Sequence, residues 1–170
     1  MADRSQSEPA LVLFSERLTS SAAFGVLFRE GMDLVEETAA YLDGDGRTEA
    51  KALERSVSLT YATESMRLTT RLMQLASWLL LHRAVKEGEM TLTQANREKT
   101  KVKLSAADPG PEDMIAKLPQ QLQDLIVRSV SLQARVRRLD LTIHAPSAER
   151  APIGNPLVPQ LNRLKAAFEQ

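Results

Sequence analysis

Apolar residues recur at helical spacing through most of the chain, and the first long segment with this pattern lies near the amino-terminal end. Ser20 or Ser21 provides an N-cap, and Gly44 provides a stop signal. Between them, the positions that share one helix face are Phe24, Leu27, Gly31, Leu34, Thr38 and Tyr41. A second set, Phe28, Val35 and Leu42, widens this face. The pattern predicts a helix that ends before Gly44 and packs against two neighbours.

A longer segment from Val57 to Glu87 contains neither Gly nor Pro, and Gly88 follows it. Its length corresponds to a helix of about 45 Å at about 1.5 Å per residue. One face carries Tyr61, Leu68, Leu72, Leu75, Leu79 and His82, and another carries Met66, Met73, Ala76 and Leu80. The helix is therefore apolar over more than half of its circumference near Trp78, and we expect it to be central. Residues 47–55 are helix-prone without a clear boundary, so that junction stays open.

A third long helix is predicted after a short one. Thr91 or Thr93 caps a short helix through Glu98, and the break at residues 108–111 is followed by Pro119, which suits a first helical turn. Apolar residues then alternate at spacings of four and three, which is typical of a helix-bundle seam. The positions are Leu118, Leu122, Leu125, Ser129, Leu132, Val136, Leu139 and Ile143, with Ser129 as the polar interruption.

The composition changes after His144, where four prolines and Gly154 lie close together as in a linker. A short amphipathic pattern follows, with apolar residues at Leu157, Leu161, Leu164 and Phe168. Because a helix this short is marginal alone in water, we expect it to dock on its own bundle or to fold on a partner. The predicted organisation is a flexible segment over 1–19, a bundle over 20–145, and a linker with an amphipathic helix over 146–170.

These patterns predict an all-α fold, an antiparallel three-helix bundle with a short connecting helix and a Pro-rich, partly flexible C-terminal tail. The chain has 170 residues, of which 43% are hydrophobic and 26% charged, values typical of one globular domain. It lacks Cys, which excludes disulfides and thiolate metal sites. We find neither a leader peptide nor an apolar run of the roughly 20 residues that a membrane span needs, so we expect a cytoplasmic protein.

Candidate chemistry is sparse. The two histidines, His82 and His144, fall in different elements and show no metal-ligand spacing. Glu36 and Glu37 point about 100° apart on a helix and do not form an acid and base pair. The chain also shows no Gly-rich phosphate loop and no nucleophile elbow. We therefore expect no catalytic residue, no cofactor, no metal site and no enzymatic activity.

Charged residues suggest two further hypotheses. Residues 97–103 hold four basic residues, but the chain has a net charge of zero and no aromatic residues among them, so direct nucleic-acid binding is a weak alternative. Arg67 and Arg71 lie one turn apart and repel each other unless an acid relieves them. They mark either a surface for an acidic partner or an ion pair within the bundle, for which Glu64 is the candidate acid.

The amino-acid sequence of the central helix is the most specific feature of the chain. Residues 59–81 read LTYATESMRLTTRLMQLASWLLL, preceded by FREGM at 28–32 and EETAAYLD at 36–43 and followed by EKTKV at 98–102. Over residues 20–145 the chain resembles the regulator of CtrA degradation family, RcdA, of alphaproteobacteria.

The resemblance implies a three-helix bundle that pairs as a homodimer and acts, without enzymatic activity, as an adaptor for the ClpXP protease in cell-cycle-regulated proteolysis. In that family a response-regulator-like protein primes the ClpX unfoldase. The RcdA protein then joins the primed protease, and cargo such as transcription regulators is delivered. A cyclic di-GMP effector protein can then attach to this assembly. The alternatives are a structural scaffold or, less favoured, a nucleic-acid-binding regulator.

Two site hypotheses follow for an adaptor of this kind. The bundle supplies a rigid docking surface, with Arg67 and Arg71 as candidate contacts, and the tail supplies a mobile second contact through Leu157, Leu161, Leu164 and Phe168. Three helices do not cover so wide an apolar face near Trp78. Trp78 and Leu79 are therefore candidates for a dimer surface or for the core.

Overall fold

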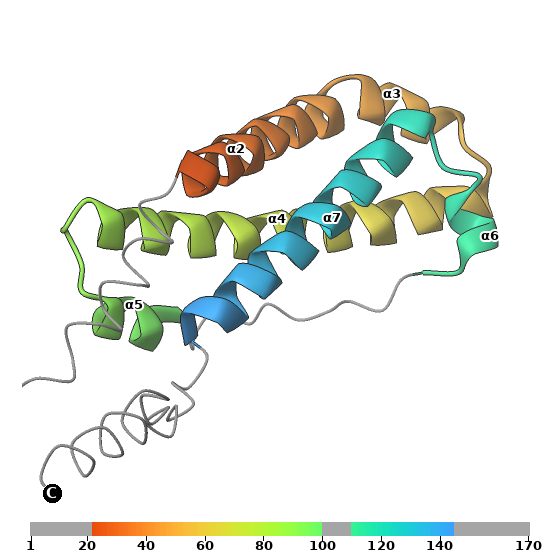
Figure 1. Ribbon diagram of the computed structural model, residues 1–170. Coiled ribbons are helices and arrows are strands. Elements are labelled where there is room, and N and C mark those ends of the chain that lie inside the picture. The colour runs from red at the N-terminus through yellow and green to blue at the C-terminus, as the bar shows by residue number, and fades with distance from the viewer. Residues whose placement is uncertain (1–21, 100–109, 145–170) are drawn as a thin grey trace, which may run out of the picture.

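The computed structural model describes residues 22–99 and 110–144, and these form six helices and no strand. The three long helices are α2 (Ala22–Asp43), α4 (Arg55–Lys86) and α7 (Gln120–His144) (Figure 1). The three short ones are α3 (Asp45–Ala52), α5 (Leu92–Lys99) and α6 (Glu112–Ile115). The all-α three-helix bundle predicted from the sequence is confirmed. The predicted amphipathic tail lies outside the described residues.

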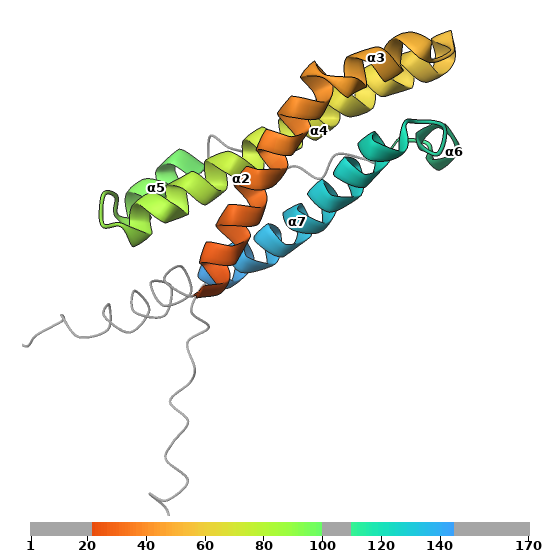
Figure 2. The ribbon, with the colours of Figure 1, turned by 90° about the horizontal axis from the view of Figure 1, so that it is seen from above.

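The direction of each long helix follows from its cross-helix contacts. Glu30 and Glu37 of α2 contact Arg135 and Arg128 of α7, so these helices are antiparallel. The hydrogen bonds from α4 to Ser129 and Asp140 advance in the same direction along both helices, so α4 and α7 run parallel. Figure 2 shows α2 lying across the pair formed by α4 and α7. On the connection between α4 and α7, α5 lies at one end of the bundle and α6 at the other (Figure 1).

The helix ends match the stop signals in the sequence. The amide of Gly44 donates to the carbonyl of Ala40 at 2.9 Å and closes α2. Gly88 has φ +76°, a conformation that favours glycine, directly after the last turn of α4. At the start of α5, the Thr91 hydroxyl accepts from the Gln94 amide at 3.2 Å, and the Gln94 side chain accepts from the Thr91 amide at 2.9 Å. This reciprocal pair is a capping box.

The open junction before the central helix is a separate short helix. α3 ends at Ala52, and the next two residues, Leu53 and Glu54, have extended backbone with ψ 149° and 153°. Two extended residues cannot continue a helical hydrogen-bond ladder, so α4 begins anew at Arg55. The pattern did not predict α6, a single turn after the Pro-rich break.

The bundle core is built from the predicted faces. In α2 the buried residues are Phe24, Leu27, Gly31, Leu34, Thr38 and Tyr41, which is the predicted set. The α7 seam is also buried except for Leu139, which is half-buried. Figure 1 shows how α2, α4 and α7 surround this common interior. Burial of these side chains supplies most of the driving force for folding.

Trp78 joins four helices. Its indole is 1% exposed, its Nε1 donates to Asp140 Oδ1 of α7 at 2.7 Å, and its ring lies 6.4 Å from that of Phe24 in α2. Lys99 at the end of α5 reaches the same Asp140 oxygen at 2.6 Å. Leu79 is also fully buried. Trp78 and Leu79 are therefore core residues, and the interpretation of these two as a dimer surface is wrong because α2 and α7 already cover them.

Gly31 of α2 lies directly against Leu79 of α4. A Cβ there would overlap Leu79 Cδ1 and lie 3.7 Å from Leu132 Cδ2 of α7. A side chain at this position would push apart the centre of the bundle. The absence of a side chain at Gly31 thus allows Leu79 to pack directly against the α2 backbone.

None of the helices in residues 22–99 and 110–144 combines the length and apolar character that crossing a membrane requires.

Two ion pairs between α2 and α7 predict a loss of stability in acid. Arg135 Nη1 lies 2.8 Å from Glu30 Oε2, and Arg128 Nη2 lies 2.7 Å from Glu37 Oε2. The hydrogen bonds from these arginines hold the pKa of both carboxyl groups below the ordinary value of 4.5. A depressed pKa in the folded state gives stability that is present above the unfolded pKa and is lost as the pH falls through the folded pKa.

We expect Glu30→Gln/Glu37→Gln to lose less stability than the parent chain when the pH falls from about 6 to about 3. Because both carboxylates are partly exposed, the difference should be about 0.2–1 kcal/mol per pair. Urea unfolding of both chains at the two pH values measures it. Equal losses would show that these pairs do not contribute.

Candidate functional site

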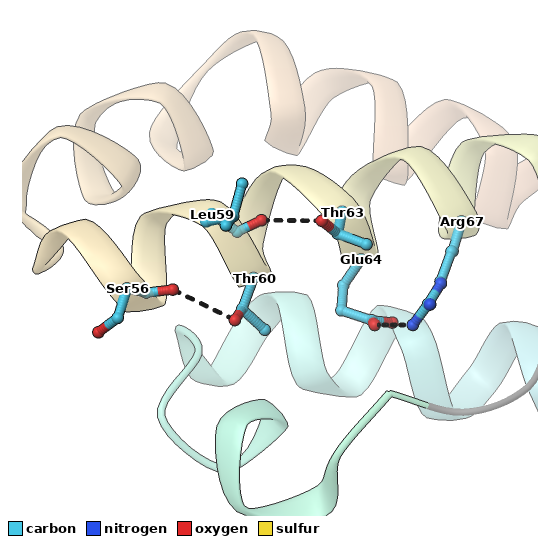
Figure 3. Close-up of polar contacts among 6 residues, drawn as sticks. All are labelled: Ser56, Leu59, Thr60, Thr63, Glu64 and Arg67. Atoms are coloured by element: carbon cyan, nitrogen blue, oxygen red, sulfur yellow. Dashed lines mark hydrogen bonds and ion pairs between the residues drawn. The ribbon is translucent and has the colours of Figure 1, made fainter.

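Arg67 lies at the edge of the bundle and is paired within its own helix. Its Nη1 donates to Glu64 Oε1 at 2.6 Å (Figure 3). Arg67 is partly exposed, whereas Glu64 is only 4% exposed. The ion pair that the sequence offered as an alternative is therefore present. A carboxylate so deeply buried needs a cation beside it, so this pair has a structural role.

Arg71 lies one turn further along α4 and is 7% exposed. Its Nη1 donates to Ser129 Oγ at 2.8 Å, and Ser129 donates in turn to the carbonyl of Ile126 at 2.7 Å. Burial lowers the pKa of Arg71, and the nearby Glu64 carboxylate opposes that shift. The interpretation of Arg71 as a surface for an acidic partner is wrong. The polar interruption of the α7 seam, Ser129, was the signal for this buried contact.

The segment before α6 covers the ion pair between Glu64 and Arg67. Gly110 is buried, and a Cβ added to it would lie 2.5 Å from Glu64 Oε1 and 3.0 Å from Arg67 Nη1. Only a residue without a side chain fits this close to the carboxylate. Gly110 therefore lies directly against the ion pair between Glu64 and Arg67.

The opposite side of α4 presents a different surface, which we call the outer stripe. It consists of Leu59, Met66, Met73 and Leu80, which are 72%, 72%, 66% and 52% exposed. These residues are seven apart and point away from the core, because about 100° per residue places them roughly opposite the buried residues Tyr61, Leu68, Leu75 and His82. Four large apolar side chains in one line on a solvent-facing helix are unusual and indicate an interaction surface.

Charge is absent from the outer stripe and from its flanks between Ser56 and His82. Between Ser56 and His82, α4 has three charged residues, Glu64, Arg67 and Arg71, and these are the buried or edge residues described above. The residues that flank the stripe are Ala, Ser and Thr at 62, 63, 69, 70, 76 and 77. Ordinary solvated helix faces carry charges, so this composition favours contact with another apolar surface.

Three of the hydroxyl groups beside the stripe are hydrogen-bonded within α4. Thr63 donates to the carbonyl of Leu59 at 3.0 Å, and Thr69 donates to that of Ser65 at 2.8 Å. Ser77 donates to the carbonyl of Met73 at 2.8 Å. Figure 3 shows the contact of Thr63 and the equivalent one of Thr60 with Ser56. Thr63 and Thr69 thus satisfy their donors within the helix, which lowers the cost of burying this face.

Other exposed apolar residues are less continuous. On α7 they are Val127, Val130 and Leu141, and Arg137 and Arg138 lie on the exposed side among them. No group of three or more His, Cys, Asp or Glu that could hold a metal occurs in residues 22–99 and 110–144. The predicted tail contacts, Leu157, Leu161, Leu164 and Phe168, lie outside the described residues. The outer stripe is thus the best-formed candidate site in the described part of the chain.

Comparison with known proteins identifies the family. Residues 15–168 match the family described as "Protein of unknown function (DUF1465)". The chain belongs to this family. No curated protein matches it. Among solved structures, the DUF1465 chain is similar to the crystal structure of RcdA from Caulobacter crescentus CB15, with 49% sequence identity and a TM-score of 0.64.

The match to RcdA covers 78% of this chain and 99% of that one. The resemblance that the sequence carried in its central helix is thereby confirmed. RcdA denotes a regulator of CtrA degradation, so similarity at this level supports a role for the DUF1465 chain in regulated proteolysis.

Proposed function

We propose that this chain is a non-enzymatic adaptor that delivers regulatory proteins to the ClpXP protease during cell-cycle-regulated proteolysis. The observation that carries the proposal is 49% identity to RcdA across nearly all of that protein. A bundle with a fully packed interior and an apolar outer stripe suits a protein that works through surfaces. The proposal also includes a cytoplasmic location, alongside the protease.

The partners of such an adaptor are ClpX, a response-regulator-like protein that primes it, and cargo such as transcription regulators. The homodimer that the resemblance implies belongs to the same proposal. Each of these contacts is with a protein, and direct contact with nucleic acid is not part of it. The net charge of zero agrees with this, because binding to nucleic acid relies on neutralising phosphates.

The tail provides the second contact in this proposal. Leu157, Leu161, Leu164 and Phe168 follow a stretch that contains three prolines, so a partner held by the bundle would meet them at a high effective concentration. A tethered contact of this kind suits transient delivery, since it adds affinity without a large rigid interface.

We expect Leu161→Ser/Leu164→Ser to weaken capture by immobilised ClpX and its priming regulator while the melting temperature stays nearly unchanged. The reason is that both leucines would contact the partner and not the core. A chain that ends at Ala145 serves as the matched control and should behave in the same way. A large loss of stability in the double variant would place these leucines on the bundle, and capture of nucleic acid without ClpX would contradict the proposed function.

A further inference from the structure

We propose that the tail, residues 146–170, docks on its own bundle when no partner is bound. It occupies the half of the outer stripe formed by Met73 and Leu80, together with the adjoining side of α2. The inference goes beyond the proposed function, because it concerns the free chain and requires neither the protease nor cargo. It gives the uncovered apolar surface an occupant that belongs to the same chain.

The two halves of the outer stripe are not equivalent. Exposure falls along it, from 72% at Leu59 and Met66 to 66% at Met73 and 52% at Leu80. Positions seven apart drift by about 20° around a helix, and here the drift turns the stripe toward α2. Arg83, whose guanidinium lies 4.9 Å from the centre of the Phe28 ring of α2, marks that side of α4. Around the helix, Leu80 is about 60° from Arg83, whereas Leu59 is about 120° from it.

The adjoining side of α2 is also apolar. Phe28 and Val35 lie seven residues apart, and both are half-buried and packed against the core. Because α2 and α4 run in opposite directions, the order from Phe28 to Val35 follows the order from Leu80 to Met73. The surface therefore carries two neighbouring apolar rows of the same spacing, one on each helix.

The tail has two apolar rows of this spacing. Leu157 and Leu164 are seven residues apart, and so are Leu161 and Phe168. On a helix these rows lie about 40° apart, so each can face one of two neighbouring helices. The right-handed sense of the helix decides which row faces which neighbour. A tail helix antiparallel to α4 places Leu161 and Phe168 on Leu80 and Met73, and Leu157 and Leu164 on Phe28 and Val35.

The length of the chain after α7 suits this position. α7 ends at His144, at the end of the bundle where α4 also ends (Figure 1). Residues 145–156 span about 37 Å at about 3.1 Å per residue, which is about three times the diameter of a helix. The tether therefore reaches around the bundle. It also holds the tail at an effective concentration of about a millimolar, which a separate partner at micromolar concentration does not match.

Docking links the tail to the outer stripe in the proposed function. A partner that binds Leu161 and Phe168 also uncovers Met73 and Leu80, so that capture of the tail and exposure of this surface become one event. That consequence rests on the proposed function, whereas the docking itself does not. Weak docking on the outside of a complete bundle adds little to the melting temperature, in agreement with the small change expected for Leu161→Ser/Leu164→Ser.

Oxidation of methionine by hydrogen peroxide, followed by mass spectrometry, tests the docking in the full-length chain. Met66 is the internal control, because it and Met73 are similarly exposed on the bundle. A dissociation constant of about 0.5 mM against an effective concentration of about 1 mM slows oxidation of Met73 about threefold. We expect Leu161→Asp/Phe168→Asp to abolish this protection and to leave Met66 unchanged.

A matched variant carries the same charges on the other side of the tail pattern. Asn162→Asp/Ala166→Asp should keep Met73 protected, because these two positions lie opposite the apolar rows. Equal oxidation rates of Met66 and Met73 in the parent chain would overturn the proposal. Equal protection of both methionines would also overturn it, because the tail covers only one half of the stripe.

Disulfide trapping tests the register, since the chain has no native cysteine. We expect full-length Leu80→Cys/Leu161→Cys to form a disulfide within one chain under mild oxidation, which requires Cα atoms within about 7 Å. Leu141→Cys/Leu161→Cys is the control, because Leu141 is 71% exposed on α7 and nearer to the tail along the chain.

An undocked tail would cross-link more readily to the control position, because closing a shorter loop costs less entropy. That result, or a disulfide between two chains in place of one within a chain, would overturn the proposal. Neither experiment contains the protease, so a failure here leaves the adaptor role to its own test. Failure to capture ClpX would likewise leave the docking of the tail unaffected.

Discussion

Trp78→Ala should lower the free energy of unfolding by about 3–5 kcal/mol, the range for removing a buried aromatic side chain. Trp78 is 1% exposed and contacts Phe24 of α2, Asp140 of α7 and His82 of its own helix. The substitution leaves a cavity at the meeting point of four helices and removes the hydrogen-bond donor to Asp140. Few other positions in the described chain combine such a volume with contacts to so many elements.

Urea unfolding followed by circular dichroism measures this effect. Leu141→Ala is the matched control, because Leu141 is a large apolar residue of α7 that is 71% exposed. Its substitution should change stability by less than about 0.5 kcal/mol. If Trp78→Ala abolished self-association while leaving the unfolding of the monomer unchanged, Trp78 would belong to a dimer surface and not to the core.

Gly31→Leu should lower the free energy of unfolding by about 3 kcal/mol, at the upper end of the range for overpacking. A Cβ at Gly31 already overlaps Leu79 Cδ1, and Leu79 is fully buried, so the neighbour has no space to move into. Leu132 closes the other side at 3.7 Å. The better helix propensity of leucine, about 1 kcal/mol over glycine, offsets only part of this cost.

Gly25 provides the control within the same helix. A Cβ at Gly25 has no atom within 4 Å, so Gly25→Ala should raise the free energy of unfolding by about 0.5–1 kcal/mol through helix propensity alone. Because the expected stability changes at Gly25 and Gly31 have opposite signs, the two variants separate the effect of packing from that of helix propensity. A stability loss of similar size at both positions would contradict the close approach of α2 and α4 at Gly31.

Much of the fold follows from spacing alone. The α2 face from Phe24 to Tyr41 and the α7 seam from Leu118 to Ile143 are predictable because each of these helices has one apolar side, which must be the buried one. Glycine positions fixed the ends of α2 and α4 with equal clarity. The predicted antiparallel arrangement describes α2 against α7, whereas α4 and α7 run parallel, because the long connection between them allows either orientation.

The spacing of apolar residues could not predict which side of α4 is buried. Leu68 and Leu75 are buried, whereas Met66 and Met73 are exposed. All four residues are large and apolar, and the two members of each pair are seven residues apart. Since the helix is apolar on both sides, the choice depends on which side α2 and α7 cover. The same ambiguity left open whether Trp78 belongs to a dimer surface or to the core, and whether Arg71 marks a partner surface or an ion pair within the bundle.

The candidate site, too, could be predicted from the sequence only in part. The sequence contained the second apolar face of α4 with Met66, Met73 and Leu80, but only the packed bundle shows that it stays uncovered by the described helices. The internal hydrogen bonds of Thr63 and Thr69 are also invisible in a sequence, because threonine can equally turn its hydroxyl to solvent. The burial of Arg71 depends on one facing residue, Ser129.

The rate at which purified ClpXP degrades CtrA, measured with the priming regulator present and with or without this chain, tests the proposed adaptor function most directly. We expect the full chain to shorten the half-life of the substrate, and a chain ending at Ala145 to do so much less. The acceleration should disappear when the priming regulator is omitted. A substrate half-life that stays the same with and without the full chain, in the presence of an active protease and its primer, would contradict the adaptor role.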